Sequence, residues 1–442
     1  MRRRAEPEAA AISTAIARPP PHRAWAILAL LACAYAIAFL DRVVLSLLVD
    51  AIKGDLQITD AQIGLLQGFA FSLVYSFLGI PLGILADRCR RMPILVAGIT
   101  VWSLANIACG FAGSFEQLFL ARAFVGIGEA ALAPIAASLI CDLFAPEKRS
   151  KAYGVYVAGN TVGAIIALSA VGFLLQASER LIAAHPGWLG GFAPWKLVFI
   201  VTGLPGLLTA LALALVREPA RMEHSGPAAG GDRRAAQTPW GTYASIVLGG
   251  MFVVAGAYAM ISWYPTLLIR VHGLSPATTG MAFGLSTMTT GLVSALGSGW
   301  IIAWLSRRGR TDAPLLTGMA GGSAYLLFGA LACLAPSPTT SLITTTVIAA
   351  FSNWITPSVL TALALLTHSR SLGKATAIYT MLTGIVSMSL GAYLPGLLND
   401  TVFQTRDGIA HSLTVVYMAC GALSIACFLL GRRSFMRQAA RT

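Results

Sequence analysis

Twelve apolar runs fill most of this chain, and each is long enough to cross roughly 30 Å of hydrocarbon as a helix. Hydrophobic residues make up 56% of the 442 residues, and charged residues only 11%. Backbone groups in lipid must find their hydrogen-bond partners within the protein, which leaves helices as the structure for runs of this length. The sequence therefore predicts an all-α membrane protein with twelve transmembrane helices, near 24–49, 62–86, 93–113, 117–143, 153–175, 196–216, 242–267, 277–305, 314–335, 341–367, 374–397 and 411–431.

Positive charges are distributed unevenly between the two sides of these predicted helices. The two tails and the loops on their side hold 24 of the 31 Lys and Arg residues, and the opposite loops hold five. Because cytoplasmic loops carry the excess of Lys and Arg, both termini are predicted to be cytoplasmic, in a bacterial inner membrane. The net charge of +13 is then a topology signal, and no nucleic-acid partner is expected.

The chain repeats itself on either side of a polar, Gly- and Pro-rich segment. A single constant offset aligns Thr59 with Ser275, Gly64 with Gly280 and Gly83 with Gly299. Any two helix starts can share Ser or Thr, but several matches at one offset favour an internal repeat. Parallel repeats around a central cavity are typical of secondary transporters. The predicted organisation is a tail at 1–23, a six-helix half at 24–216, a linker at 217–241, a second six-helix half at 242–431 and a tail at 432–442.

Four charged residues lie inside the first half, which is unusual because each costs about 2.5–3.5 kcal/mol near the bilayer centre. Asp41 and Arg42 belong to the first predicted helix, and Arg122 and Glu129 to the fourth. Seven residues separate Arg122 from Glu129, which places them on nearly one helical face. Two acids and two bases at similar depth form a neutral set whose members must be paired or hydrated. The set is either a functional cluster, which a transporter-like bundle favours, or a structural ion network.

The segment that follows the second predicted helix, GILADRCRR at 83–91, resembles the cytoplasmic signature of the major facilitator superfamily. Arg90 departs from the signature, because the family usually has glycine there. In the second half the corresponding stretch, 299–308, has lost the acid and the base of the signature. The alternative is that these arginines serve only as positive-inside charges. The predicted cytoplasmic gate consists of Asp87, Arg88 and Arg91.

Four stretches of the first half resemble the spinster family of this superfamily. They are YAIAFLDRVVLSLL at 35–48, Ile58-Thr59-Asp60, RAFVGIGEAALAP at 122–134 and DLFAPEKR at 142–149. The resemblance implies the major facilitator fold and export of lysolipids or sphingosine-1-phosphate, coupled to protons in some members. Related organic-anion symporters also carry an Asp-Arg pair in the first helix, so that branch stays open as an alternative.

The second half has no Asp, Glu, Lys or Arg well inside its predicted helices. A cavity between the halves would then be charged on one wall and weakly polar or apolar on the other, which suits an amphiphile. Tyr258, Trp263, Asn353 and Trp354 are candidates for the second wall. Each can instead be a packing residue, and a small organic anion held by arginine alone fits the same pattern.

These observations predict a secondary transporter whose substrate and proton compete for one charge network. Burial favours the protonated form of a carboxyl group and a nearby arginine the ionised form. An anionic substrate on Arg42 or Arg122 would therefore release Asp41 or Glu129 to bind a proton. The chain has no G-x-x-x-x-G-K-[ST] loop for ATP and no catalytic constellation, metal site or cofactor motif. We expect a monomer in contact with membrane lipids; the alternatives are a transporter of small organic anions or drugs, and a non-transporting membrane sensor.

Overall fold

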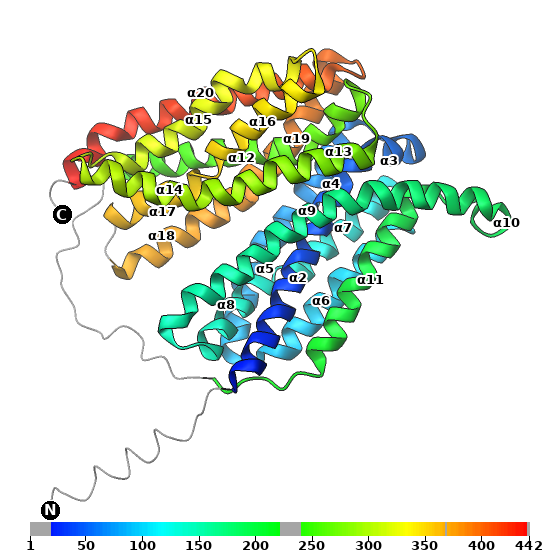
Figure 1. The fold of residues 1–442 in the computed structure, drawn as a ribbon, viewed down its shortest axis with the longest axis horizontal. Helices are drawn as coiled ribbons and strands as arrows, with labels where there is room; N and C mark the ends of the chain where they lie inside the picture. Colours follow the sequence, from blue (N-terminus) through cyan, green and yellow to red (C-terminus); the bar gives the residue numbers. More distant parts are fainter. Residues whose placement is uncertain (1–18, 222–239, 367–368, 440–442) are drawn as a thin grey trace, which may run out of the picture.

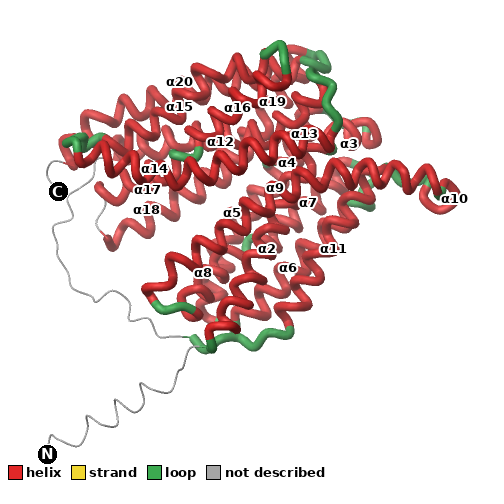
Figure 2. Tube along the Cα trace, in the orientation of Figure 1, coloured by secondary structure: helices red, strands yellow, loops and turns green. Residues whose placement is uncertain are grey.

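The structure is a computed structural model that describes residues 19–221, 240–366 and 369–439. All regular elements in these residues are helices, as the sequence predicts (Figure 2). The first half contains α2 (Pro21–Leu47), α3 (Val49–Leu56), α4 (Asp60–Gln67), α5 (Phe69–Arg88), α6 (Arg91–Cys109), α7 (Phe115–Glu129), α8 (Leu132–Leu143), α9 (Pro146–Ala184), α10 (Pro186–Leu189) and α11 (Pro194–Ala214).

The second half is also helical throughout its described residues and contains three short π-helical segments. Its elements are α12 (Trp240–Arg270), α13 (Pro276–Phe283), η1 (Gly284–Met288), α14 (Thr289–Arg307), α15 (Ala313–Leu334), α16 (Pro338–Ser352), α17 (Ile355–Leu366), α18 (Ser369–Leu382), η2 (Thr383–Ser387), α19 (Met388–Leu398), η3 (Asn399–Phe403) and α20 (Gly408–Ala439). Eleven helices among the described residues are long and apolar enough to cross a membrane. The remaining predicted span, the eighth at 277–305, corresponds to α13, η1 and α14, which follow one another without a break.

Two predicted spans differ from the observed helices in an informative way. The first, 24–49, is interrupted at Leu48, whose N–H bonds to the carbonyl of Leu45 instead of continuing the α-helical pattern. The backbone carbonyl of Ser46 accepts a hydrogen bond from the Thr266 hydroxyl in the second half, at 3.2 Å. The fifth, 153–175, is the middle of a 39-residue helix, because apolar composition marks only the part of α9 that lipid would surround.

The helices form two bundles, one from each half of the chain (Figure 1). The bundles meet at the end where α3, α4 and α13 lie, here called the closed end, and diverge toward the end where α8, α17 and α18 lie. We call this second end the basic end, because it carries the Arg-rich turn after α5. Contacts between the halves join α4 to α19, α9 to α13 and α2 to α12.

The internal repeat is visible in the breaks of the helices. Both α7 and α16 have 15 residues, and each is followed by a two-residue break and then a further helix, α8 and α17 respectively. The glycines matched by sequence also occupy equivalent places in the fold. A Cβ on Gly64 would lie 2.7 Å from the Ala392 carbonyl oxygen, and one on Gly280 would collide with the carbonyl oxygen of Leu168. Both glycines therefore permit close contact between the halves.

Candidate functional site

The charged pair in the first helix is divided between two partners in the fourth. Arg42 on α2 donates from Nε and Nη2 to one oxygen of Glu129, at 2.8 and 2.7 Å. Glu129 is the last residue of α7, so its side chain lies beside the helix break. The Glu129 carboxylate is fully buried, whereas the Arg42 side chain has 19% relative solvent exposure. The pair is therefore reachable from the Arg42 side.

Arg122 contacts the main chain of Asp41, whereas the sequence suggested an ion pair between their side chains. Nη1 of Arg122 donates to the backbone carbonyl oxygen of Asp41 at 2.7 Å. Both side chains are completely buried. Within the described residues, neither carboxylate oxygen of Asp41 has a hydrogen-bond donor, and Nε and Nη2 of Arg122 have no acceptor. The structure thus brings all four charges into one region and leaves much of their bonding capacity unused.

Aromatic rings surround the Arg42–Glu129 pair. The guanidinium carbon of Arg42 lies 4.9 Å from the ring centres of both Phe71 and Tyr75. The rings of Tyr35 and Tyr156 stack on each other, with their centres 4.7 Å apart. None of these four rings was singled out by the sequence, because aromatic residues are ordinary in membrane helices.

The candidates for the second wall are placed differently from one another. Tyr258 is half-buried against the hydrophobic core of the first half and lies close enough to Arg42 to interact electrostatically. The offset that aligns the glycines of the two halves also aligns Tyr258 with Arg42, so the two occupy repeat-equivalent positions. Trp263 is wrong as a wall residue, because it is fully buried and donates its indole N–H to the Ala392 carbonyl.

Asn353 and Trp354 form the break between α16 and α17, which is the repeat equivalent of the break beside Glu129. Asn353 is exposed, and its amide donates to the Ala349 carbonyl at 2.8 Å. The indole N–H of Trp354 is buried without an acceptor in the described part of the chain. Ser352 is the last residue of α16, as Glu129 is of α7, so the break in the second half has no charged side chain beside it.

At the closed end, a cluster that the sequence did not predict joins the two halves. Asp60 is fully buried and accepts hydrogen bonds from Lys53 of its own half and from Arg270 and Asn399 of the other, at 2.6–2.9 Å. Arg270 also bonds to Asp50 at 2.8 Å. These residues lie in the first or last turn of a helical element, where charges are ordinary, and the partners come from opposite halves of the chain. Only Asp60 had a signal, as part of the motif Ile58-Thr59-Asp60.

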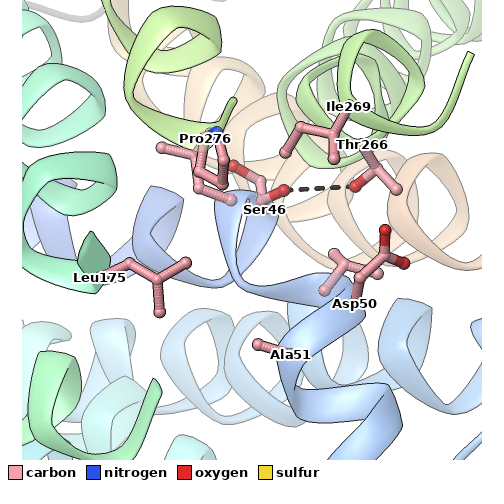
Figure 3. A pocket seen from close by; sticks show the side chains of 9 residues that line it. Ser46, Asp50, Ala51, Leu175, Thr266, Ile269 and Pro276 are labelled. Atoms are coloured by element: carbon pink, nitrogen blue, oxygen red, sulfur yellow. Dashed lines mark hydrogen bonds between the residues drawn. The ribbon is translucent and has the colours of Figure 1, made fainter. Parts of the chain in front are cut away.

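The same cluster contains a helix cap supplied by the other half. The carboxylate of Asp400 accepts from the backbone N–H groups of Asp60 and Ala61, at 3.2 and 2.6 Å. These N–H groups belong to the first turn of α4, where a negative charge is favourable. The cluster borders a polar cavity of about 650 Å³. A smaller cavity of about 130 Å³ lies beside the Ser46–Thr266 hydrogen bond (Figure 3).

The three predicted gate residues differ in their surroundings. The side chain of Asp87 lies outside what the structure describes, and Arg88 is exposed. Arg91 is buried within the first half, where it pairs with Asp142 at the end of α8. It also donates from Nε to Glu218, just after α11, at 3.3 Å. In this conformation Arg91 connects segments of its own half.

The chain has similarity to known transporters along most of its length. The model of the Major Facilitator Superfamily matches residues 31–328. An MFS-type efflux pump of Mycolicibacterium smegmatis is 25% identical over 98% of both chains. Protein spinster homolog 1 of Bos taurus is 31% identical over 70% of this chain, which spans 60% of that relative's length.

A solved structure gives the same result for the fold. A bacterial homologue of the human lysosomal transporter spinster, in an inward-facing and unoccupied conformation, superposes with a TM-score of 0.81 at 26% identity. The comparison covers 94% of this chain and 98% of that one. The chain therefore belongs to the Major Facilitator Superfamily, as a multi-pass membrane transporter of the spinster type.

Proposed function

We propose that this protein is a secondary active transporter that moves an amphiphilic anion of the lysophospholipid or sphingosine-1-phosphate type, coupled to protons. The observation that carries the proposal is the Arg42–Glu129 pair. Arg42 is partly accessible and holds one oxygen of Glu129, while the other oxygen is buried without a donor among the described residues. An anionic headgroup can therefore replace Glu129 as the partner of Arg42.

Replacement of Glu129 by the substrate as the partner of Arg42 would couple substrate binding to proton binding. A buried carboxylate that loses its arginine is unstable as a charge and is stabilised by taking a proton. Glu129, fully buried at the end of α7, is in this position once a substrate occupies Arg42. Asp41, buried without a donor in the described part of the chain, is the second proton carrier, and Arg122 beside it is the second anion partner. Substrate and proton then bias the same equilibrium, and their coupling is reciprocal.

The two unlike halves favour an amphiphile as substrate. The four charges within the predicted spans belong to α2 and α7. In the second half, Tyr258 stands at the position equivalent to Arg42, and Ser352 at the end of the helix equivalent to α7. A headgroup would bind Arg42 and Arg122, and the chain would lie along the second half, where Tyr258, Asn353 and Trp354 contribute uncharged surface. The likeness to spinster proteins supports this interpretation of the substrate.

Alternating access follows from the closed-end cluster. Contacts of Asp60 with Arg270 and Asn399 hold the halves together at one end only, and they must break for the other state to form. The charge distribution of the sequence supports placing the basic end and both termini in the cytoplasm, with the protein in a bacterial inner membrane. The present state would then face inward, with Asp87, Arg88 and Arg91 near the open mouth. The transporter acts as a monomer in this proposal.

The experiment is transport of labelled lysophosphatidic acid by the purified protein in liposomes with an imposed pH gradient. Glu129→Gln is expected to insert and fold normally and to reduce pH-driven transport at least about tenfold, because it cannot carry the proton. Glu179→Gln, an exposed residue near the end of α9, is the matched control and should leave transport unchanged. If Glu129→Gln retains the full pH dependence, Glu129 is not the proton carrier.

A second candidate is transport of small organic anions or drugs, which the likeness to an MFS-type efflux pump favours. A binding screen separates the two. If long-chain lysolipids and sphingoid phosphates bind best, and Arg42→Ala loses this binding, the result supports an amphiphilic substrate. If only short anions bind, the result supports the second candidate. Binding without transport in liposomes identifies a sensor.

A further inference from the structure

Phe71 lies between the two arginines of the site. Its ring centre is 4.9 Å from the guanidinium carbon of Arg42 and 5.9 Å from that of Arg122. Tyr75 follows one turn later on α5, and its ring stacks on Phe71 with centres 5.2 Å apart and an angle of 21°. Phe71 is fully buried, while Tyr75 is partly exposed.

The backbone of this region is built to hold Phe71 close to the fourth helix. A Cβ on Gly126 would lie 2.7 Å from the Phe71 carbonyl oxygen, so α7 contacts α5 directly at this point. The α5 helix begins at Phe69, immediately after the break at Gly68. Phe71 is thereby fixed between Arg42 on α2 and Arg122 on α7.

A guanidinium group has two kinds of contact surface, and this arrangement uses them separately. Its edge carries the N–H donors, which bind Glu129 here, and its flat faces can lie against aromatic rings. Ring contact therefore does not compete with hydrogen bonding at the edge. A guanidinium held by rings keeps its place when the edge changes partner, and the ring attraction is stronger where water is excluded.

We propose that Phe71 and Tyr75 are positioning residues: they form an aromatic platform that holds Arg42 while its edge passes between Glu129 and the anionic group of the substrate. This inference rests on the proposed function of Arg42. The platform makes affinity for an anionic amphiphile depend on two uncharged rings. Affinity for a neutral amphiphile of the same chain length does not depend on them.

The first test measures binding of lysophosphatidic acid and of a neutral monoacylglycerol to the purified full-length protein. Phe71→Leu and Tyr75→Leu are expected to weaken binding of lysophosphatidic acid about tenfold and to change monoacylglycerol binding less than about twofold. Tyr75→Phe keeps a ring and should bind as the unmodified protein does. Phe199→Leu is the matched control, because Phe199 is fully buried in the same half and packs on Trp195. Equal weakening for both lipids, or Phe71→Leu behaving as Phe199→Leu, overturns the platform.

A second test does not depend on the substrate. Phenylglyoxal modifies accessible arginines, and mass spectrometry reports the rate at Arg42. Loss of the ring in Tyr75→Leu should raise that rate severalfold, whereas Tyr75→Phe should leave it unchanged; equal rates in all three proteins overturn the platform. If instead Arg42→Ala leaves lysophosphatidic acid binding intact, the proposed function fails, and the modification rates still decide whether the rings hold Arg42.

Discussion

Gly126 illustrates how a single residue determines the geometry of the site. It lies within α7, between Arg122 and Glu129, and its α-carbon faces the backbone of Phe71. A methyl group there would meet a carbonyl oxygen, which belongs to a helix and cannot rotate away. The approach of α7 to α5, and with it the position of both charged side chains, depends on the absence of a side chain at residue 126.

We expect Gly126→Ala to destabilise the protein by about 1–3 kcal/mol, the usual cost of overpacking, and to weaken binding of an anionic substrate. Gly79→Ala on α5 is the control, since a Cβ there has no neighbour within 4 Å. The same change at Gly79 should raise stability slightly through better helix propensity. Thermal unfolding in detergent measures both. Equal behaviour of the two variants would show that the close approach at Gly126 is not needed.

At this scale the sequence predicted the four charged residues but not their bonding. Charges inside apolar runs are rare, so Asp41, Arg42, Arg122 and Glu129 were identified from their positions alone. That Arg122 bonds to a backbone carbonyl, and not to the Asp41 carboxylate, depends on how the helices pack. No spacing along the chain contains that information. The same holds for Phe71, whose importance comes from its neighbours.

At the scale of helices, one loop charge ties two elements of the second half together. Asp312 precedes the first residue of α15 and accepts hydrogen bonds from Arg310 and from Arg432 on α20, at 3.1 and 2.8 Å. Burial raises the pKa of the Asp312 carboxyl, but the hydrogen bonds from the two arginines outweigh burial and hold this pKa below its ordinary value of 3.8. Folding therefore favours the ionised form.

The sign of the resulting pH dependence follows from this lowered pKa. The stabilisation is fully present above the ordinary value and is lost as pH falls through the lower pKa of the folded state. We expect Asp312→Asn to lower the melting temperature at pH 7 and to flatten its acid dependence below about pH 4. Melting curves of both proteins over this range provide the measurement. Parallel curves would mean that Asp312 contributes nothing to the acid sensitivity.

The helix breaks have a signal in the sequence, although it does not lie at the break itself. The break after Glu129 falls at Ala130 and Ala131, which are good helix formers. Its repeat equivalent falls at Asn353 and Trp354. Both breaks share a proline four residues after their first residue, Pro134 after Ala130 and Pro357 after Asn353. A proline has no N–H for the helical hydrogen bond, and its ring clashes with the carbonyl four residues earlier, so it breaks the helix at that point.

At the scale of the whole molecule, the closed-end cluster joins the two halves and must open in the alternating-access cycle proposed above. Asp60 is fully buried in this state and has two donors from the opposite half, Arg270 and Asn399. Removing one partner of a buried pair costs about 3–5 kcal/mol, because the remaining charge is left without compensation. When the halves separate at this end, water replaces the lost partner. A substitution of either Asp60 or Arg270 therefore destabilises the state that is closed at this end and has little effect on the state that is open there.

Arg270→Gln and Asp60→Asn are accordingly expected to shift the population toward the state that is open at this end by at least about tenfold. Pairs of spin labels across the closed end should report longer distances, and pairs across the basic end shorter ones. Because the two residues bond to each other, the double variant should shift the equilibrium by less than the sum of the single effects. Arg406→Gln is the control, since Arg406 borders the same cavity and has no salt bridge within the described residues. Unchanged distances in both single variants would mean that helix packing, through contacts such as Gly64 on Ala392, holds this end closed without the charges.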